Sequence, residues 1–263
     1  MSSSSTIHQS ISDDGVIEIV QEASFRSLYF GNNTKQSEMD ISQPERLVLA
    51  YTQAMMAGLL FCPAPKSILL IGLGGGSLAR FLLHHLSSCK IDVVEFREDV
   101  VKLAYGYFCL PNDKRLHIII NDGFDFLVSN NRLNKKYDMV LIDAFTHEGI
   151  AESIKSIQFF EACYDALDGE GIMAINLWDS MEDQFDETMD NIESAFRNHV
   201  VDMPVTDKGN VIAFATRSHE SFPSFRTLKP IAESLEQQLN LSFGTYLREL
   251  RRNNRWRALT RFF

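Results

Sequence analysis

The fold of this 263-residue chain is decided by the stretch Ile68-Leu69-Leu70-Ile71-Gly72-Leu73-Gly74-Gly75-Gly76-Ser77. The apolar run Ser67–Ile71 predicts a buried strand, and the apolar spacing over Leu78–Leu86 predicts a helix packed on a sheet. The glycines between them allow positive φ and a close approach of a ligand, and free N–H groups at the helix start favour a polar or anionic partner. A second strand ends in Val93-Val94-Glu95, whose carboxylate can accept both hydroxyls of a ribose. Together these features predict a nucleoside site; the alternative is a structural turn beside a surface glutamate.

Downstream of the glycine turn the chain alternates between predicted strands and helices. We expect strands at 68–71, 91–95, 116–121, 139–142 and 172–177, and helices at 78–86, 98–108, 123–128, 159–167 and 183–196. Such alternation predicts a parallel, doubly wound α/β sheet. Two last strands, 200–204 and 211–216, flank Asp207-Lys208-Gly209-Asn210, which predicts a hairpin turn. An antiparallel pair at the end of a parallel sheet favours the class I S-adenosylmethionine-dependent methyltransferase-type Rossmann-like fold.

The remaining segments suggest a division of the chain into parts. We expect a disordered tail at 1–14, a small N-terminal β unit at 15–43, a Rossmann-like nucleoside-binding catalytic domain at 44–218 and a C-terminal helical segment at 219–263. The β unit is too small to be stable alone. A helix is expected over Pro44–Leu60, with Pro44 in its first turn and Ser42 as its cap. Asp168-Gly169-Glu170-Gly171 is expected to be a turn.

The composition narrows the classes of partner. A formal charge of −10 argues against broad nucleic-acid binding, because phosphate contacts need a surplus of Lys and Arg on one face. No apolar stretch approaches the roughly 18 residues that span a bilayer, and no secretory signal is visible. The cysteines lack metal-site spacing, so we expect no metal. These features predict a cytoplasmic protein with no nucleic-acid or membrane partner.

A basic run near the C-terminus is the local exception to the acidic balance. Its arginines are interleaved with Trp256 and Phe262-Phe263: Arg248, Arg251, Arg252, Arg255, Arg257 and Arg261. One interpretation is a surface for RNA, lipid or an acidic partner. The other, which we favour, is a solvated helix end whose aromatic side chains pack on a neighbouring subunit, so we expect a homodimer.

Ligands of open α/β sheets lie beyond the carboxyl ends of the strands, so the residues that end each strand are the candidate site. Asp122 would bind an adenine amine, or it would only cap the helix that starts at Gly123. Asp143 suits a cationic centre such as a sulfonium or an amine, or it caps the next segment. His147 would act as a base, or it is simply solvated. The stretch Asn176-Leu177-Trp178 would wall the substrate cavity, or Trp178 is plain packing.

The residues from about Gly15 to Thr216 resemble the spermidine synthases, the polyamine aminopropyltransferases. The resemblance rests on Gln36 and Asp40, the Gly-Gly-Gly turn, the Val-Val-Glu of the second strand, the Asn-Asp-Gly-Phe at 121–124 and the Tyr-Asp-Met-Val-Leu-Ile-Asp at 137–143. It implies a site for decarboxylated S-adenosylmethionine, or S-adenosylmethionine itself, as co-substrate, and a small-molecule amine as acceptor. In it Gln36 would face the sulfonium side, Glu95 the ribose, Asp122 the adenine and Asp143 the reacting end. The expected contacts are Gln36, Gly72, Gly74, Gly75, Gly76, Ser77, Glu95, Phe96, Asp122, Gly123 and Asp143.

This chain departs from the family pattern at three places that bear on the chemistry. Ser77 follows the glycines where the family has Asp, Thr146 stands at the usual catalytic Asp, and Pro44-Glu45 stand where a Tyr followed by His or Gln helps to seat the diamine. Loss of a base costs about 10²-fold or more. A hydroxyl at Ser77 also relaxes the discrimination against ordinary S-adenosylmethionine, whose carboxylate an Asp would repel. The candidate replacements for the lost carboxylates are Glu45, Glu148 and Asp179.

Three functions follow from these observations. The first is aminopropyl transfer to a polyamine, with Asp143, Thr146 and His147 as the catalytic candidates and with His147 or Glu148 accepting the proton. The second is methyl transfer from S-adenosylmethionine to a small acceptor. The third is a non-catalytic nucleoside-binding protein whose C-terminal segment recruits a partner.

Overall fold

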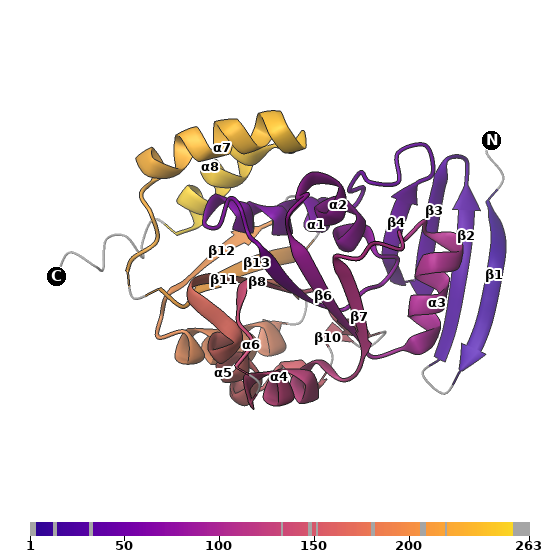
Figure 1. Ribbon diagram of the computed structural model, residues 1–263, viewed down its shortest axis with the longest axis horizontal. Coiled ribbons are helices and arrows are strands. Elements are labelled where there is room, and N and C mark those ends of the chain that lie inside the picture. Colours follow the sequence, from indigo (N-terminus) through magenta and orange to yellow (C-terminus); the bar gives the residue numbers. More distant parts are fainter. Residues whose placement is uncertain are drawn as a thin grey trace.

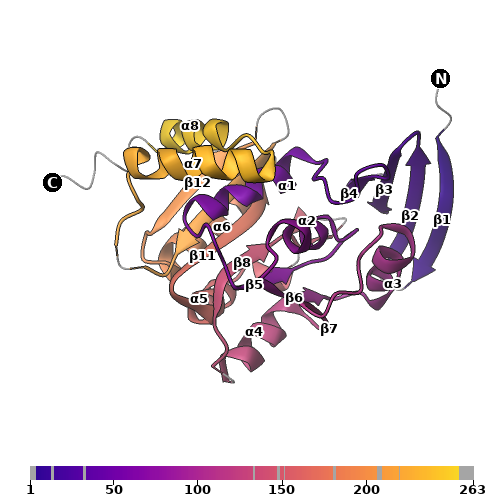
Figure 2. The same cartoon turned by 45° about the horizontal axis from the view of Figure 1, so that its top comes forward.

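Two β-sheets of unequal size build the molecule (Figure 1). The computed structural model describes residues 4–12, 15–31, 34–132, 134–146, 149–150, 152–179, 182–205, 209–218 and 220–254. A four-stranded sheet lies at the N-terminal end, and a seven-stranded sheet with helices on both faces forms the body. The first described strand and the last described helices lie at opposite sides of the molecule (Figure 2).

The large sheet has the strand order β12-β13-β11-β8-β5-β6-β7. Its strands are β5 Ser67–Ile71, β6 Lys90–Glu95, β7 Leu116–Ile120, β8 Tyr137–Ile142, β11 Leu167–Trp178, β12 Val200–Pro204 and β13 Asn210–Thr216. Neighbouring strands from β11 to β7 are parallel, whereas β13 is antiparallel to both β11 and β12. The expected class of α/β fold is confirmed. The order reverses at β5, where a crevice opens beyond the carboxyl ends of the strands.

Helices cover both faces of this sheet (Figures 1 and 2). One face carries α1 Ala50–Met55, the 3₁₀ turn η1 Met56–Leu60, α2 Ser77–His85, α7 Phe225–Leu239 and α8 Phe243–Asn253. The other face carries α4 Gly123–Arg132, α5 Ile157–Ala166 and α6 Glu182–Ala195. Alternate residues of the central strands point into the two layers, which gives two separate apolar cores.

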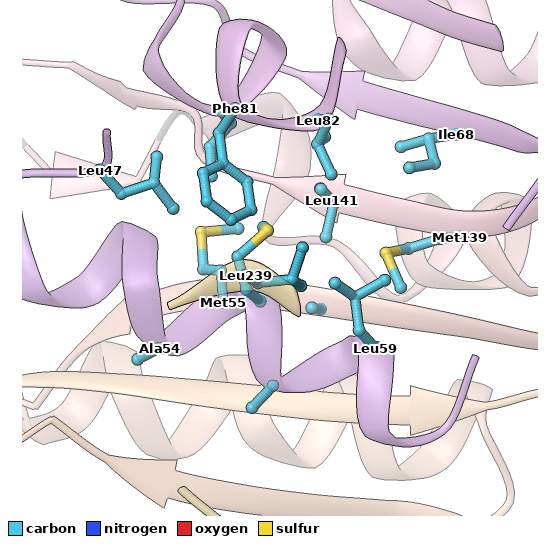
Figure 3. Packing of buried hydrophobic residues seen from close by; sticks show 14 of the residues in the cluster. Leu47, Ala54, Met55, Leu59, Ile68, Phe81, Leu82, Met139, Leu141 and Leu239 are labelled. Carbon is cyan, nitrogen blue, oxygen red and sulfur yellow. The ribbon is translucent and has the colours of Figure 1, made fainter. Parts of the chain in front are cut away.

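The first core joins segments that are far apart in the sequence. Figure 3 shows side chains from the segment before α1, from α1, from η1, from α2, from β5, from β8 and from α7 pointing toward one another. Met55, Leu59 and Leu82 are fully buried there. Because α1 and η1 lie in this layer, the segment before β5 is fixed against the sheet and Tyr51 is held at its crevice.

The N-terminal sheet is larger than the sequence suggested. Its strands are β1 Ser5–Ser12, β2 Gly15–Glu22, β3 Phe25–Phe30 and β4 Thr34–Asp40, all antiparallel. The expectation of disorder over 1–14 is wrong for the segment that forms β1, a polar strand with little local signal. Its hydrogen bonds come from pairing with β2, and Tyr107 bonds to His8 across 3.3 Å. The sheet packs on α3 Glu98–Tyr107, so it does not stand alone.

Two local expectations also fail. The helix expected from Pro44 starts only at Ala50, and Ser42 does not cap it: both its hydroxyl and its amide donate to Asp40 Oδ1, at 2.7 and 3.0 Å. The turn expected at Asp168–Gly171 lies inside β11 as an irregularity where the pairing with β8 shifts register. Asp207 and Lys208 of the expected hairpin turn lie outside the described residues, while Gly209 and Asn210 are described and the antiparallel pairing of β12 with β13 is present.

The C-terminal segment up to Asn254 forms the pair of helices α7 and α8, which pack on each other and on η1 and β12. The basic run is thus helical at Arg248, Arg251 and Arg252, and its later members lie outside the described residues. None of the helices in the described part of the chain is long and apolar enough to cross a membrane.

Candidate functional site

A cavity of about 260 Å³ opens where β5, β6 and β8 end and where β4 of the small sheet meets the large one. Its walls come from both sheets and from α1. The described residues that line it are Phe30, Gln36, Ser37, Tyr51, Thr52, Ile71, Gly72, Leu73, Gly74, Ser77, Leu78, Val94, Glu95, Phe96, Arg97, Asn121, Asp122, Gly123, Asp143, Ala144, Ser153 and Ile154. The volume suits a nucleoside-sized ligand.

The glycine turn forms the floor of this cavity. Gly72 has φ +92°, and a Cβ added there would lie 2.2 Å from the carbonyl oxygen of Asp143. Gly76, with φ +71°, is the N-cap of α2. A side chain at Gly72 would push β8 away, so glycine at this position is what allows the end of β8 to close on the turn.

Glu95 ties the end of β6 to the glycine turn. Its Oε2 accepts the Leu73 amide at 2.8 Å and its Oε1 accepts the Arg97 amide at 2.9 Å. Burial raises the pKa of Glu95, against the backbone hydrogen bonds, which lower it. The carboxylate also lines the cavity, so it can accept hydroxyl groups of a ligand there.

Asp122 follows β7 and caps α4. Its Oδ1 accepts the amides of Phe124 and Asp125 at 2.8 and 3.2 Å, and its Oδ2 accepts the Ser153 hydroxyl at 2.8 Å. The capping role considered from the sequence is therefore present. Asp122 also lines the cavity, so an adenine contact is compatible with the cap and stays a prediction.

Asp143 ends β8 and sits between two hydrogen-bond donors. Tyr51 Oη lies 3.1 Å from its Oδ2, and Asn176 Nδ2 lies 3.1 Å from its Oδ1. Burial raises the pKa of Asp143 to about 6, while the two donors act in the opposite direction. The same surroundings raise the pKa of Tyr51 well above its usual value, chiefly through burial and then through Asp143. At neutral pH this pair offers one carboxylate and one neutral phenol to the cavity.

Ser77 begins α2 and meets the small sheet. Its hydroxyl lies 3.1 Å from that of Ser37 on β4, and both side chains are buried. Behind it, the Arg80 guanidinium donates to the carbonyls of Pro44 and Phe108 at 2.9 and 2.6 Å, and also to the carbonyl of Gly75. Burial lowers the pKa of Arg80 to about 10. Arg80 is therefore a clamp that holds the glycine turn against its neighbours.

The cavity brings together most of the residues expected to contact the cofactor. Of that set, Gly75 and Gly76 are not among its described lining residues. A Cβ at Gly75 would lie 2.7 Å from Ser37 Oγ, so this glycine faces the small sheet. The backbone of Thr146 lies in β9 Phe145–Thr146, which pairs with β10 Gly149–Ile150, and His147 lies outside the described residues.

The expected wall at Asn176–Trp178 takes a different form. Asn176 is connected to the cavity through its hydrogen bond to Asp143. Trp178 is 39% exposed and is not among the described residues that line the cavity. The candidate replacements Glu45 and Asp179 are likewise absent from that lining, while Glu148 lies outside the described residues.

Tyr51 and Thr52 line the cavity, although the sequence did not mark them as candidate site residues. Pro44 and Glu45 were aligned with a Tyr followed by His or Gln, but they do not line the described cavity, and the Pro44 carbonyl is bound by Arg80. A tyrosine is present seven residues after Pro44, on α1. The signal available was the Tyr-Thr pair itself within the predicted helix. Arg97 and Ser153 also line the cavity. Arg97 follows the end of β6 and Ser153 follows a loop, and neither belongs to a sequence motif that would mark it.

Gln36 adds an unused donor to the cavity wall. Its Nε2 is buried without a hydrogen-bond partner among the residues that the structure describes, while Tyr51 Oη lies 3.3 Å from its main-chain oxygen. A buried amide N–H that is not paired costs free energy. The position is therefore suited to a ligand with an acceptor atom. No cluster of three His, Cys, Asp or Glu side chains among the described residues is arranged to hold a metal ion.

Sequence comparison identifies relatives of this arrangement. A model of the spermine/spermidine synthase domain matches residues 49–220. The polyamine aminopropyltransferase of Chromobacterium violaceum is 33% identical over 243 residues, which cover 92% of each chain. The chain belongs to the spermine/spermidine synthase family. It is a transferase, as its curated relatives are, so the interpretation as a non-catalytic protein is set aside.

Solved structures with the same fold are less similar to this chain in sequence. A spermidine synthase in complex with the transition state analogue AdoDATO superposes with a TM-score of 0.74 at 19% identity, covering 93% of this chain and 84% of that one. Human methyltransferase-like protein 13 in complex with SAH superposes with a TM-score of 0.68 at 23% identity, covering 73% of this chain and 93% of that one. At these identities the likeness shows the fold alone.

Proposed function

We propose that this family member transfers an aminopropyl group from decarboxylated S-adenosylmethionine to an amine of a polyamine. The observation that carries the proposal is Asp143, a carboxylate with Tyr51 on one oxygen and Asn176 on the other, at the wall of a nucleoside-sized cavity. An anion at this point attracts the cationic amine and the sulfonium carbon that the amine attacks. The Chromobacterium violaceum relative, a polyamine aminopropyltransferase, supports the same reaction.

The nucleoside end of the cavity fits the other half of the donor. Glu95 has free lone pairs for ribose hydroxyls, and Asp122 has an oxygen near Ser153 within reach of an exocyclic amine. Gln36 offers its unpaired Nε2 on the same wall. In this arrangement the adenosine lies between β5, β6 and α4, and the sulfonium lies toward Asp143.

The chemistry requires a neutral amine at the moment of attack. The nitrogen lone pair forms the new C–N bond as the C–S bond breaks, methylthioadenosine leaves with the sulfur electron pair, and the nitrogen loses one proton. We assign orientation of the amine to Asp143, and His147 or Glu148 stay the candidates for the proton acceptor.

The direct test is incubation with decarboxylated S-adenosylmethionine and putrescine, followed by detection of methylthioadenosine. We expect product from the native chain and a loss of about 10²-fold in kcat for Asp143→Asn, because the amine is no longer held in position for attack. A Glu98→Gln variant on the exposed face of α3 is the matched control and keeps full activity. No methylthioadenosine at high enzyme concentration would overturn the proposal.

Methyl transfer from S-adenosylmethionine is the second candidate, and Ser77 is the observation that favours it. The buried hydroxyl places no negative charge on that part of the wall, so a carboxylated donor is not repelled there. Under this alternative S-adenosylhomocysteine binds more tightly than methylthioadenosine in calorimetry. Tighter binding of methylthioadenosine would count against methyl transfer.

A further inference from the structure

Behind Asp143 a line of buried amide side chains runs across the sheet. Asn210 Nδ2 donates to Asn176 Oδ1 at 2.9 Å, and Asn176 Nδ2 donates to Asp143 Oδ1 at 3.1 Å. Asn176 is 3% exposed and Asn210 is 7% exposed. The line therefore connects β13 to β8 through β11, away from solvent.

The two asparagines interrupt an apolar face. Asn176 pairs with Ile212, and Trp178 pairs with Asn210, so Asn176 and Asn210 lie on the same face of the sheet as Ile172, Ala174 and Phe214. Ile172, Ala174, Ile212 and Phe214 belong to the first core. Buried amides on such a face cost free energy unless each is hydrogen-bonded. Their bonds lead to one end point, the Asp143 carboxylate.

The direction of the line is set at Asn210. A primary amide can turn either its NH₂ group or its carbonyl oxygen toward a neighbour. Because Asn210 donates to Asn176 Oδ1, the NH₂ group of Asn176 is the part left for Asp143. Without that donor, only the bond to Asp143 holds the amide in this orientation, and the buried Asn176 carbonyl loses the partner that fixes its plane.

We propose that Asn210 is a positioning residue for Asp143: by donating to Asn176 it keeps an N–H group on the carboxylate and so keeps that carboxylate ionised in the cavity wall. The inference rests on the proposed function for its catalytic meaning, but the relay itself is a property of the described side chains. Asn210 does not line the cavity and touches Asp143 only through Asn176.

The other groups that face Asp143 do not replace this donor. Tyr51 of α1 bonds the opposite oxygen, Oδ2. The remaining ionisable groups on the described cavity wall are Glu95 at the end of β6, Arg97 after β6 and Asp122 after β7. Glu95 is committed to backbone amides and Asp122 to the start of α4, whereas Arg97 pairs with Asp99 at 2.9 Å. None of these groups on the described wall donates to Asp143 Oδ1 in place of Asn176. Loss of the Asn210 donor should therefore change the proton affinity of Asp143.

The test is a titration of the Asp143 carboxyl carbon by ¹³C NMR in the native chain and in Asn210→Leu, with the resonance assigned from Asp143→Asn. We expect Asp143 to bind its proton about tenfold more tightly in Asn210→Leu, the effect of losing one hydrogen bond to a charged group. Asn210→Ala removes the same donor without apolar bulk and serves if the leucine variant does not fold. Val200→Ala is the control for ordinary loss of packing and should leave the titration unchanged. Val200 lies on β12 and packs in the second core, on the face of the sheet opposite to Asn210.

Activity gives the second measurement. The acidic limb of the kcat/KM profile should move to higher pH by the same amount in Asn210→Leu, and the rate should recover at alkaline pH. A uniform loss at all pH values with an unchanged carboxyl titration would mean a merely structural role and would overturn the proposal. If the native chain shows no transfer at all, the proposed function fails, while the NMR titration still decides the relay.

Discussion

A buried charge on the cavity wall lowers the stability of the folded chain, and Asp143 is the clearest case. Burial raises its pKa to about 6, above the value near 3.9 of an unfolded chain. A carboxyl whose pKa is raised by folding favours the folded state below about pH 4, and this contribution is lost as the pH rises through about 6. At neutral pH the ionised group is thus a destabilising one, kept for its chemistry.

Asp143→Asn tests that cost. We expect the variant to gain free energy of unfolding over the native chain at pH 8, by at most about 3 kcal/mol, and to gain little at about pH 4.5. Urea unfolding at both pH values measures the difference. A gain that is equal at the two pH values would show that the charge of Asp143 is not what costs stability.

Glu95 supports a second prediction. In Glu95→Gln one of the backbone amides that the carboxylate binds, such as that of Leu73 or of Arg97, faces an NH₂ group instead of an acceptor. We expect methylthioadenosine to bind at least about tenfold more weakly, because a charged acceptor is lost at the turn and at the ribose. Isothermal calorimetry measures the affinity. Glu98→Gln, which alters only an exposed pair with Lys102, should bind as the native chain does.

The residues that could be predicted from the sequence are those whose signal is local. Glu95, Asp122 and Asp143 each end a strand, and strand ends converge on one edge of a parallel sheet. Tyr51 could not be placed in this way, since its contact with Asp143 joins positions 92 apart in the chain. Asn210 was missed for the same reason: its partner lies 34 residues away, on another strand.

At the scale of elements, Arg80 holds three of them together. From α2 its guanidinium reaches the glycine turn, the end of α3 and the segment before α1. That attachment explains why no helix forms at Pro44, whose carbonyl is bound by Arg80 and whose segment runs in turns and bends up to Leu49. The start of α1 was mispredicted because Pro44 and Ser42 are good local start signals, and a tertiary contact overrides them.

Arg80→Met should therefore destabilise the chain and its site together. The carbonyls of Gly75 and Phe108, which are buried, and the partly buried carbonyl of Pro44 lose their donor. We expect the free energy of unfolding to fall by about 3–5 kcal/mol. Nucleoside affinity should fall as well, because the glycine turn loses its support. Urea unfolding and calorimetry measure the two effects. The exposed Arg226→Met on α7 is the control; an equal loss in both variants would contradict the clamp.

At the scale of the whole molecule, the C-terminal helices complete a core that begins at β5. Leu228, Leu235, Phe243 and Leu247 are buried in the same cluster as Leu70 and Leu141 of the central strands (Figure 3 shows part of it). The sequence predicted a helical segment here but not what it packs against, because amphipathic spacing indicates which face of a helix is buried and not the partner of that face. Removal of 222–263 would therefore expose the main core, so such a truncation cannot isolate a role in assembly.

Point substitutions in α7 and α8 test this coupling without truncation. Leu235→Ala and Phe243→Ala should each lower the free energy of unfolding of the entire chain by about 2–5 kcal/mol, the cost of a cavity in a packed core. We expect one cooperative unfolding transition, in which circular dichroism and the hydrogen exchange of β5 amides change together. Methylthioadenosine should raise the midpoint of this transition. Lys229→Ala, at an exposed pair with Glu233, should have a midpoint within error of the native chain. If α7 and α8 melted first and left the β5 amides protected, the helices would be an appendage, and the single core inferred from their buried side chains would be wrong.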